Sequence, residues 1–276
     1  MIWHVRTKAL TIEQPLIMGI VNVTPDSFSD GGQFQGVAEA VDHGLRLVAE
    51  GADLVDVGGE STRPGAVDVS IEEELSRVVP VVEALSARGV IVSVDTSKPA
   101  VAVAAMEAGA EIVNDVTGFR NPEMQRVVVE RKPGVVVMHM AGSPRTMQDN
   151  PQYHDVVAEI GEYLTGQAAL LEHAGLDANR ICVDPGIGFG KTTDHNLALL
   201  ANTSVLAGLG YPLMVGASRK RFIGAVVDVE SVEDRDRATA VLSGLVTFLG
   251  ASVVRVHNVV YSRQAMLLSA AIVART

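Results

Sequence analysis

Three consecutive cations, Arg219, Lys220 and Arg221, stand at the start of a segment with helical spacing. Positive charge at a helix N-terminus opposes the helix dipole, at a cost of roughly a few tenths to 1 kcal/mol per residue. Structural needs alone would not select that arrangement. An anion site would, because the dipole, the free backbone N–H groups and the basic side chains all attract one ligand. With Ser218 before them, these residues predict an anion-binding position.

A second basic pair, Arg255 and His257, lies at the end of the β-rich run 253–256. Side chains alternate along a strand, so these two project to the same side, with Val256 opposite. His257 alone would be compatible with a satisfied core histidine. Paired with Arg255 at a strand end, it indicates a phosphate contact.

Asp184 also ends an apolar run, and a Pro-Gly turn follows it. The segment DPGIGFGK at 184–191 superficially resembles a phosphate loop, but it lacks the spacing G-x-x-x-x-G-K-[ST]. A carboxylate held before a rigid turn is better placed to accept two hydrogen bonds from a planar N–H and NH2 edge. We therefore expect Asp184 to bind such an edge.

Asp95 and Asn114 end two further runs, and each has a structural alternative. Asp95, or Thr96 or Ser97 beside it, could cap a helix that begins at Pro99, and for Asp95 taken alone the cap is favoured. Asn114, followed by Asp115, has the same ambiguity. These residues alone leave both interpretations open.

Two loops are rich in turn-forming residues, at 24–32 and 58–66. The first carries Phe28, and a lone aromatic in a loop gains little unless it packs on something. A closing lid explains it better than a solvated loop does. In the second loop, backbone N–H groups and Arg63 could bind phosphate oxygens, although a βα turn that simply needs glycine is the alternative.

Other kinds of catalytic centre lack a matching pattern. His139, between Met138 and Met140, is interpreted as strand-end packing. No histidine pair has zinc spacing, and there is no cysteine cluster. The nucleophile motif Gly-x-Ser-x-Gly is also absent. The candidate chemistry is therefore anion handling beside a planar-ring contact.

The elements that must position these residues alternate along the chain. Short β-rich runs are expected at 17–21, 54–57, 91–94, 111–113, 135–138, 181–183, 213–215 and 253–256. Helical spacing is found in segments such as 37–50, 71–88, 99–108, 153–174 and 235–250, with glycines 51, 89, 109, 175 and 250 as expected C-terminal caps. Strand–helix alternation of this kind predicts an α/β fold, a (β/α)8 TIM barrel, with an open doubly wound sheet as the competing topology.

Nearly every expected strand ends in a polar or charged residue. In a barrel these positions converge at the carboxyl end of the strands, where active sites of this fold lie. Core packing does not require such a set, so the distribution indicates an enzyme. No linker or low-complexity tract divides the chain, and we expect one domain over 1–276. Residues 1–14 precede the first strand and are expected to cap the barrel floor.

Composition narrows the class of protein. Hydrophobic residues make up 47% of the 276, enough for a large core, and the net charge is −11. That charge argues against binding nucleic acid or anionic membranes. Cys182, the single cysteine, cannot form a disulfide within the chain, and no signal peptide or membrane span is apparent. We expect a soluble protein located in the cytoplasm.

The motifs in order are similar to those of dihydropteroate synthases. IVNVTPDSF at 20–28 and GESTRPG at 59–65 resemble the two signature segments of that family. The later matches are VDT at 94–96, VND at 113–115, MHM at 138–140, PRTMQ at 144–148, DPGIGFGK at 184–191, SRK at 218–220 and RVH at 255–257. The resemblance runs from the first strand to the end of the chain, in register with the expected units.

This resemblance implies a barrel fold, a homodimer built from C-terminal helices, and a transferase of folate biosynthesis. The reaction would join 6-hydroxymethyl-7,8-dihydropterin pyrophosphate to p-aminobenzoate, giving 7,8-dihydropteroate and pyrophosphate. The amine of p-aminobenzoate is neutral at pH 7, so it needs no strong general base, and none is obvious in the sequence. Sulfonamides would inhibit by competing with p-aminobenzoate. The apolar stretch 265–273 agrees with a helix buried between subunits.

The resemblance also implies residue roles. The pterin would be bound by Asp95, Asn114, Met138, Asp184, Phe189, Lys220 and Arg255. The pyrophosphate would be bound by Asn22, Thr62, Arg63, Arg255 and His257, with Asn22 as the protein ligand to Mg2+. The p-aminobenzoate site would be formed by Phe28, Thr62, Pro64, Ser218, Lys220 and Arg221. Asn22, Asp95, Lys220, Arg255 and His257 would form the catalytic set.

Two alternatives belong to other classes. Pterin-binding methyltransferases that serve corrinoid proteins share the barrel and the Asp/Asn pterin contacts. They have no need for the Ser-Arg-Lys and Arg-x-His anion set, which this chain carries at 218–220 and 255–257. A non-catalytic pterin-binding paralogue would be expected to lose loop or pyrophosphate residues, and none is lost here.

Overall fold

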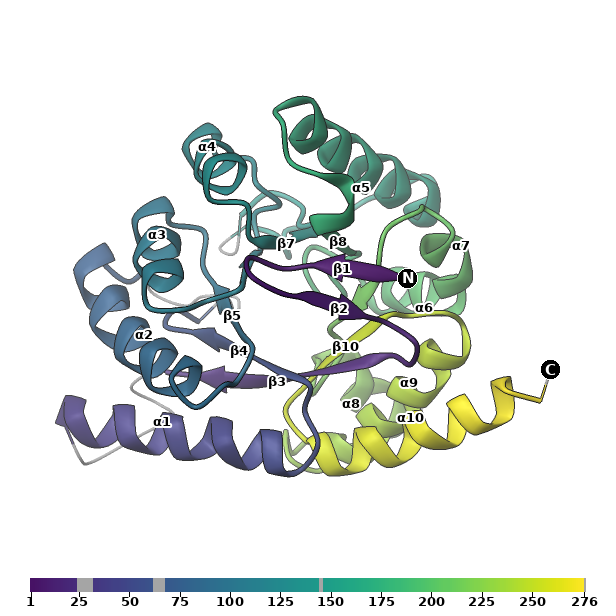
Figure 1. Cartoon of the computed structure of the whole chain (residues 1–276). Helices are drawn as coiled ribbons and strands as arrows, with labels where there is room; N and C mark the ends of the chain where they lie inside the picture. The colour runs from purple at the N-terminus through teal and green to yellow at the C-terminus, as the bar shows by residue number, and fades with distance from the viewer. Residues whose placement is uncertain (24–31, 62–67, 144–145, 276) are drawn as a thin grey trace.

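The protein is a barrel of parallel strands surrounded by helices (Figure 1). A computed structural model describes residues 1–23, 32–61, 68–143 and 146–275. The sheet has eight strands in the order β8-β7-β6-β5-β4-β3-β10-β9, and a parallel bridge between Val183 and Leu213 closes the ring. Every neighbouring pair is parallel. The predicted TIM barrel is confirmed, and the open-sheet alternative is wrong.

The barrel strands match the predicted β-rich runs within two residues at each end. Their bounds are β3 (Leu16–Asn22), β4 (Leu54–Gly58), β5 (Val92–Asp95), β6 (Ile112–Asp115), β7 (Gly134–Met138), β8 (Ile181–Asp184), β9 (Met214–Val215) and β10 (Val253–Val256). The agreement arises because strands covered by helices are apolar on both faces and stand out as continuous runs.

The expected helical segments correspond to helices, with more helices between them. Their bounds are α1 (Gly32–Ala49), α2 (Ile71–Ser86), α3 (Pro99–Glu107), α4 (Pro122–Arg131), α5 (Val156–His173), α6 (Thr193–Ala201), α7 (Thr203–Ala207), α8 (Arg221–Val227), α9 (Arg235–Phe248) and α10 (Val259–Val273), with a 3-10 turn η2 (Ala178–Arg180). Two crossovers hold two helices each, α6 with α7 and α8 with α9. None of the helices within the described ranges is long and apolar enough to cross a membrane.

The helix ends follow local capping rules. The Ser70 side chain accepts a hydrogen bond from the Glu73 backbone N–H at the start of α2. The Asp155 side chain accepts from the Val157 and Ala158 backbone N–H groups at the start of α5. The five glycines expected to close helices all have positive φ, as at Gly51 (107°) and Gly109 (112°). Residues with a Cβ rarely adopt that conformation, so the glycines determine where these helices stop.

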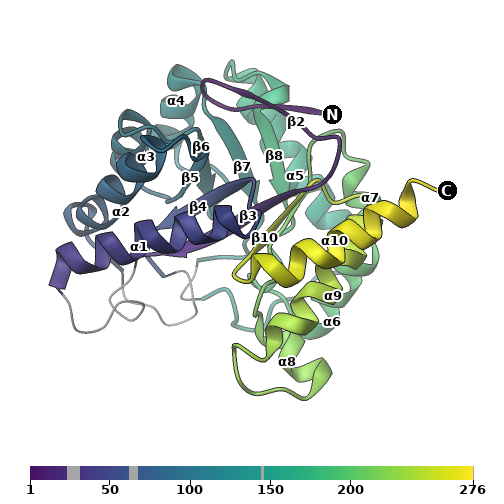
Figure 2. The ribbon, with the colours of Figure 1, turned by 60° about the horizontal axis from the view of Figure 1, so that its bottom comes forward.

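The floor of the barrel is apolar and covered by the N-terminal segment. Strands β1 (Ile2–His4) and β2 (Ala9–Thr11) form an antiparallel hairpin that lies across one end of the barrel, with α8 at the other end (Figure 2). Trp3 is fully buried, and its Nε1 donates a hydrogen bond to the Arg180 carbonyl at 2.9 Å. It packs with inward-facing side chains of the strands, including Met18, Leu54 and Cys182. The prediction that residues 1–14 cap the floor is confirmed.

Candidate active site at the carboxyl end of the barrel

Above the apolar floor, the inward-facing positions become polar. Side chains alternate along each strand, so the next inward residue after Leu54 is Asp56 and the next after Val253 is Arg255. By the same period Asn114 follows Ile112 and Asp184 follows Cys182. These side chains are buried or largely buried. The barrel therefore carries a charged layer directly on top of a hydrocarbon floor.

Arg255 lies at the centre of this layer. Its Nε donates to Asp56 Oδ2 at 2.6 Å, and its Nη2 donates to Asp95 Oδ2 at 2.9 Å. Burial works against the charged guanidinium, but the carboxylates of Asp56 and Asp95 outweigh it and raise the pKa of Arg255 above its ordinary value. Arg255 is therefore a permanent cation held between two strands that are far from it in sequence.

Asp95 faces the barrel interior and does not cap a helix. Helix α3 begins after Lys98 with no side-chain cap, and Thr96 Oγ1 instead accepts the Lys98 backbone N–H at 3.2 Å. Burial, together with the nearby charge of Asp56, raises the pKa of Asp95 to about 7, with Arg255 opposing the shift. The helix-cap alternative for Asp95 is wrong.

Asn114 and Asp115 have separate roles. Asn114 Nδ2 donates to Asp56 Oδ2 at 2.9 Å inside the barrel. Asp115 points outward and accepts from the backbone N–H groups of Thr117 and Phe119, at 2.8 and 3.0 Å. The structural role that the sequence left open therefore belongs to Asp115, and Asn114 belongs to the interior polar layer.

Asp184 is anchored by the turn that follows it. Its Oδ1 accepts the Gly186 backbone N–H at 2.7 Å. Gly186 has φ of 65°, and a Cβ there would lie 1.9 Å from the His139 carbonyl oxygen, so only glycine fits. Burial raises the pKa of Asp184 to about 6, against the Gly186 hydrogen bond and the charges of Lys220 and Arg255.

An apolar wall stands beside Asp184. Met138 and Phe189 belong to a small cluster of buried side chains with Val116, Met140 and Met147. The ammonium of Lys220 lies 3.9 Å from the centre of the Phe189 ring. Such a cation over an aromatic face is attracted by the ring quadrupole. The predicted pterin residues of β7, the 185–190 turn and α8 therefore meet at one side of the polar layer.

Behind that wall lies a buried lysine that the sequence reasoning did not single out. Lys191 Nζ donates to the carbonyl oxygens of Gly186 and Phe189 at 2.9 and 3.0 Å. Its third neighbour is His139 Nδ1, at 3.0 Å. Burial lowers the pKa of Lys191 to about 7, and burial with the Lys191 charge lowers the pKa of His139 to about 3. The packing role predicted for His139 is confirmed, because its ring also packs edge-on against the Tyr163 ring, with the two ring centres 4.8 Å apart.

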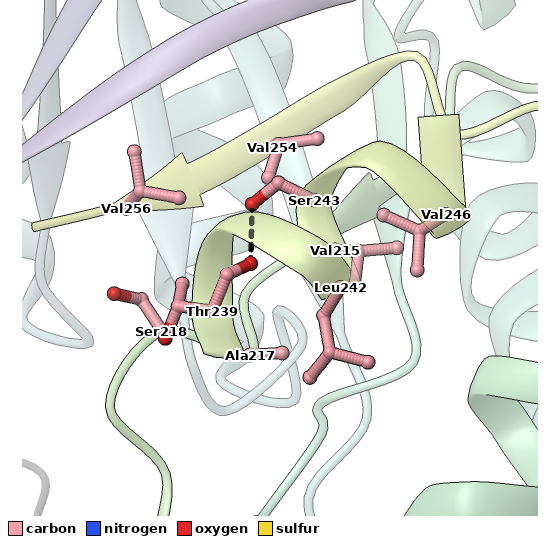
Figure 3. Close-up of a pocket in the computed structure, with 9 residues that line it drawn as sticks. All are labelled: Val215, Ala217, Ser218, Thr239, Leu242, Ser243, Val246, Val254 and Val256. Atoms are coloured by element: carbon pink, nitrogen blue, oxygen red, sulfur yellow. Dashed lines mark hydrogen bonds between the residues drawn. The ribbon is translucent and has the colours of Figure 1, made fainter. Parts of the chain in front are cut away.

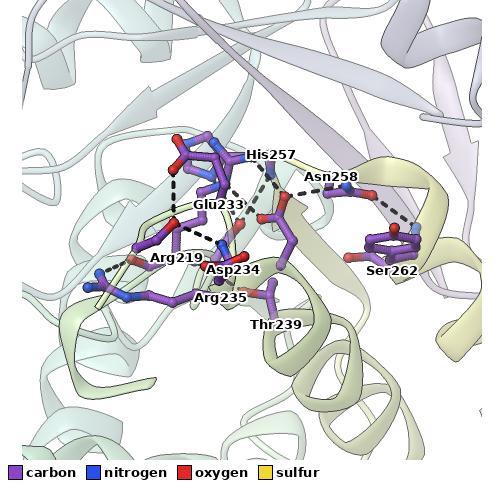
Figure 4. Close-up of polar contacts among 12 residues, drawn as sticks. Arg219, Glu233, Asp234, Arg235, Thr239, His257, Asn258 and Ser262 are labelled. Carbon is purple, nitrogen blue, oxygen red and sulfur yellow. Dashed lines mark hydrogen bonds and ion pairs between the residues drawn. The ribbon is translucent and has the colours of Figure 1, made fainter. Parts of the chain in front are cut away.

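The three consecutive cations do not act together. Arg219 forms a two-point ion pair with Asp236 of α9, at 2.7 and 2.8 Å, and Figure 4 shows the polar contacts around it. The expectation that all three would attract one anion is therefore wrong for Arg219, whose charge is already matched. Lys220 is the N-cap residue of α8, and Arg221 is exposed at the start of that helix.

Ser218 and His257 are brought together across the barrel wall. Ser218 Oγ lies 3.0 Å from His257 Nδ1 and accepts the His257 backbone N–H at 3.1 Å. Asn22, at the end of β3, and His257 line a cleft of about 430 Å³ that also touches Ile20 and four residues of α1. Two of the predicted pyrophosphate residues, Asn22 and His257, therefore share one opening.

Asn22 suits a magnesium ion in its donor chemistry. Mg2+ takes hard oxygen ligands and keeps several waters, and it is often held by one or two protein groups plus substrate phosphates. Within the described ranges, no group of three or more His, Cys, Asp or Glu side chains could hold a metal. An amide oxygen beside a pyrophosphate would supply the kind of partial ligand set that Mg2+ accepts.

A second cavity, between the barrel wall and α9, is too small for a substrate. It has a volume of about 10 Å³, roughly the room for one water. Its lining includes Val215, Val254 and Val246, and Ser243 Oγ donates to the Thr239 carbonyl at 2.9 Å (Figure 3). It is a packing defect behind the strands.

Four predicted site residues, Phe28, Thr62, Arg63 and Pro64, lie outside the described residues. Next to the second of these segments, Lys98 bridges two carboxylates, Glu60 at 2.6 Å and the fully buried Glu74. Glu60 also accepts the Val69 backbone N–H at 2.9 Å. These contacts connect the end of β4 to α2 and to the β5–α3 turn.

Asp56 and Lys191 are the interior residues that sequence reasoning missed. For Asp56 a signal existed: an acidic residue in the middle of an apolar strand, in phase with Leu54. Asp56 was missed because it lies inside its strand, two residues before the strand's end at Gly58. For Lys191 the signal was weaker, because a lysine after a glycine-rich turn is usually solvent-exposed.

Comparisons with known proteins agree with this geometry. Residues 18–257 match the family described as "Pterin binding enzyme". The dihydropteroate synthase of Escherichia coli (strain K12) is 44% identical over 259 residues, covering 94% of this chain and 92% of that protein.

Solved structures give the same family. A Xanthomonas albilineans dihydropteroate synthase solved with 4-aminobenzoic acid has 48% identity and a TM-score of 0.90, over 96% of this chain and 95% of that one. Its complex with 7,8-dihydropteroate gives 44% identity and a TM-score of 0.88, over 96% of both chains. A Yersinia pestis dihydropteroate synthase solved with a sulfonamide drug has 41% identity and a TM-score of 0.93, over 99% of this chain and 100% of that one.

Proposed function

The chain belongs to the dihydropteroate synthase family of pterin-binding enzymes, and we infer that it performs that reaction. It condenses 6-hydroxymethyl-7,8-dihydropterin pyrophosphate with p-aminobenzoate to give 7,8-dihydropteroate and pyrophosphate. The observation that carries this is the buried polar layer of Asp95, Asn114, Asp184 and Arg255 above an apolar floor. A flat, donor-bearing heterocycle suits such a layer, and a core would not contain it.

The pterin binds by its edge and by its faces. Asp184 accepts hydrogen bonds from a ring N–H and the exocyclic NH2, while Asn114 and Asp95 contact the ring from the neighbouring strands. Met138 and Phe189 cover one apolar face, and Lys220, held over Phe189, lies near the edge bound by Asp184. Arg255 lies along the ring, and with Asn22 and His257 it binds the pyrophosphate.

The chemistry follows from charge placement. The C–O bond to pyrophosphate breaks, and the electron-rich pterin spreads the positive charge that develops on the methylene carbon. The neutral amine of p-aminobenzoate attacks, a C–N bond forms, and the amine passes one proton to the released pyrophosphate or to water. Mg2+, when bound, neutralises charge on the departing pyrophosphate. Arg255 and His257 contribute to that neutralisation at the barrel mouth.

A turnover assay tests the function directly. Purified protein with both substrates is expected to release pyrophosphate and form dihydropteroate in equal amounts. Release of pyrophosphate without dihydropteroate would mean hydrolysis, and binding without turnover would favour the non-catalytic paralogue. Methyl transfer to a corrinoid protein would favour the methyltransferase alternative.

We propose Mg2+ as the cofactor, with Asn22 as its protein ligand. Excess chelator is expected to abolish turnover, and added Mg2+ to restore it. Calorimetry gives a second readout, because inorganic pyrophosphate should bind more weakly without the metal, and Asn22→Ala should reduce that difference. Full activity in chelator would contradict the metal role.

We propose that sulfonamides compete with p-aminobenzoate, near Ser218 and Arg221 at the start of α8. The support is a relative solved with a sulfonamide drug. Phe28, Thr62 and Pro64 are assigned to the same site by family resemblance, and Thr62 and Arg63 to the pyrophosphate. Inhibition kinetics are expected to be competitive with p-aminobenzoate and to require pyrophosphate and Mg2+. Competition with the pterin substrate would contradict this.

We propose a homodimer through α9 and α10. These helices pack together, as when Ser269 Oγ donates to the Gly244 carbonyl at 2.6 Å, and they leave large apolar side chains exposed. Leu268 is 65% exposed and Leu245 54%. Monomeric proteins rarely expose apolar patches of this kind without a partner.

The dimer is tested by mass and by a matched pair of substitutions. Light scattering should give twice the chain mass, and Leu268→Glu should shift it toward monomer. Leu170→Glu is the control, since Leu170 is also exposed but lies on α5. We also propose a cytoplasmic location, in keeping with the buried free thiol of Cys182; cell fractionation tests it.

A further inference from the structure

Asp56 forms a buried junction within the polar layer. Its side chain has no solvent exposure, and one oxygen, Oδ2, accepts both from Arg255 Nε at 2.6 Å and from Asn114 Nδ2 at 2.9 Å. Asp56 follows the floor residue Leu54 on its strand as Asn114 follows Ile112 and Arg255 follows Val253, so it belongs to the same polar layer as the residues assigned to the pterin.

The hydrogen bond to Asp56 determines which way the Asn114 amide points. An amide turned the other way would place its oxygen against the Asp56 carboxylate, where two acceptors repel. With Nδ2 donating to Asp56, Asn114 Oδ1 is buried and has no partner among the described residues. A buried acceptor without a donor is costly, so Oδ1 is prepared for an N–H from a ligand.

Charge balance alone does not explain Asp56. Arg255 already pairs with Asp95 at 2.9 Å, so a second buried carboxylate adds repulsion, and its charge raises the pKa of Asp95. Buried ions without a compensating role are disfavoured in cores. Holding two ligand-binding side chains in one geometry would be a compensating role for Asp56. The side chains of a binding site must be held within about half an ångström of their working positions.

We propose that Asp56 is a positioning residue that orients Asn114 and Arg255 toward the pterin without touching it. The proposal rests on the proposed function, because it assigns the oriented groups to the same site. It assigns Asn114 an acceptor role, so the ligand atom that it meets is an N–H donor.

The test removes the acceptor at position 56 or keeps it without its charge. Asp56→Leu removes both hydrogen bonds and should weaken pterin binding roughly 10- to 100-fold, with the KM for p-aminobenzoate nearly unchanged. Asn114→Asp places two carboxylates together and should weaken it at least as much. Asp56→Asn keeps an amide oxygen at the place of Oδ2, where it can accept from both Arg255 and Asn114. Its pterin affinity should be at least tenfold higher than that of Asp56→Leu.

Ser93→Ala is the matched control. Ser93 is buried on the adjacent strand, in register with Asp56, and its Oγ makes no hydrogen bond to any residue that the structure describes. Its pterin affinity and turnover should equal those of the wild type. Thermal unfolding of each variant separates lost folding from lost binding.

The outcomes distinguish this proposal from the function itself. A wild type that neither binds pterin nor turns over contradicts the function. An active wild type whose Asp56→Leu variant folds and binds pterin normally overturns the positioning role. So does a folded Asp56→Asn variant that binds pterin no better than a folded Asp56→Leu variant.

Discussion

Arg255 and Lys191 both lie in the interior of this barrel, but their pKa values are shifted in opposite directions. Arg255 is held by the carboxylates of Asp56 and Asp95, and these raise its pKa against the effect of burial. Lys191 has only neutral acceptors, His139 and the carbonyls of Gly186 and Phe189, and burial lowers its pKa to about 7. The Arg255 side chain keeps 20% exposure and Lys191 4%, but burial opposes the charge of both, so their partners decide the direction in which each pKa shifts.

The two residues therefore have different proposed roles. The charge of Arg255 acts on a ligand, and the hydrogen bonds of Lys191 stabilise the fold. Arg255 keeps its proton at every working pH and is the cation proposed to act on the pyrophosphate. Lys191 holds the 185–190 turn, which carries Phe189 and lies under Asp184. The acceptors around Lys191 need a hydrogen-bond donor but no positive charge. A lysine with a pKa of about 7 supplies that N–H donor at a smaller desolvation cost than a permanently charged group would.

Removing Arg255 should have the largest effect. Arg255→Met leaves Asp56 and Asp95 buried without a cation, and breaking a buried pair this way costs about 3–5 kcal/mol. Turnover should fall with it, since the leaving group loses a cation. Urea unfolding and steady-state kinetics measure the two losses. The control is Arg131→Met, which breaks an exposed pair with Glu107 and should cost less than about 1 kcal/mol. Equal losses of unfolding free energy in the two variants would mean that the Arg255 pair is no stronger than an exposed one.

Asp184→Asn should have the next largest effect, because Asp184 influences both cations. The asparagine presents NH2 donors where the ring edge also donates, and an unpaired buried donor costs about 1–3 kcal/mol. Calorimetry should show pterin affinity lower by roughly tenfold or more. Near wild-type affinity would remove Asp184 from the site. The stability loss should be smaller than for Arg255→Met.

Lys191→Met should have a moderate effect with a distinctive pH dependence. Three hydrogen bonds are lost, at about 1 kcal/mol each net, and the methionine fills part of the space. In the wild type, the folded pKa of about 7 lies below the ordinary value of 10.5, so between these values the unfolded chain holds a proton that the folded one releases. Wild-type stability therefore rises with pH across this window, by up to about 1.4 kcal/mol per unit.

The variant lacks that proton, so the gap between wild type and Lys191→Met should widen from pH 7 to pH 10. Urea midpoints at four pH values in this range measure it. A gap that stays constant would mean that Lys191 keeps its ordinary pKa, and the contrast with Arg255 would then fail.

Arg219→Met should have the smallest effect. Arg219 is 25% exposed and neutralises one carboxylate, Asp236, whereas Arg255 neutralises two, of which Asp56 has no solvent exposure. We expect a loss of about 1 kcal/mol in unfolding free energy and little change in pterin affinity. If Arg219→Met weakened pterin or pyrophosphate binding without changing stability, Arg219 would belong to the anion site after all.

Several features followed from the sequence because they depend on local order. The strand runs are apolar on both faces, the helix ends carry glycine, and the strand ends carry polar residues. Asp184 before Pro-Gly and the Ser-Arg-Lys segment are recognisable without any contact being known. Family resemblance added the role predicted for each of these polar ends.

The partners of the charged residues were decided only by the tertiary structure. Asp95 could have capped α3, and what directs it inward is Arg255, 160 residues later in the chain. Asp56 and Arg255 are 199 residues apart and meet because the ring of strands closes. Arg219 turns away from the ligand because α9 brings Asp236 beside it. A carboxylate or a cation satisfies its charge with whichever group lies within about 3 Å, and local sequence does not specify that distance.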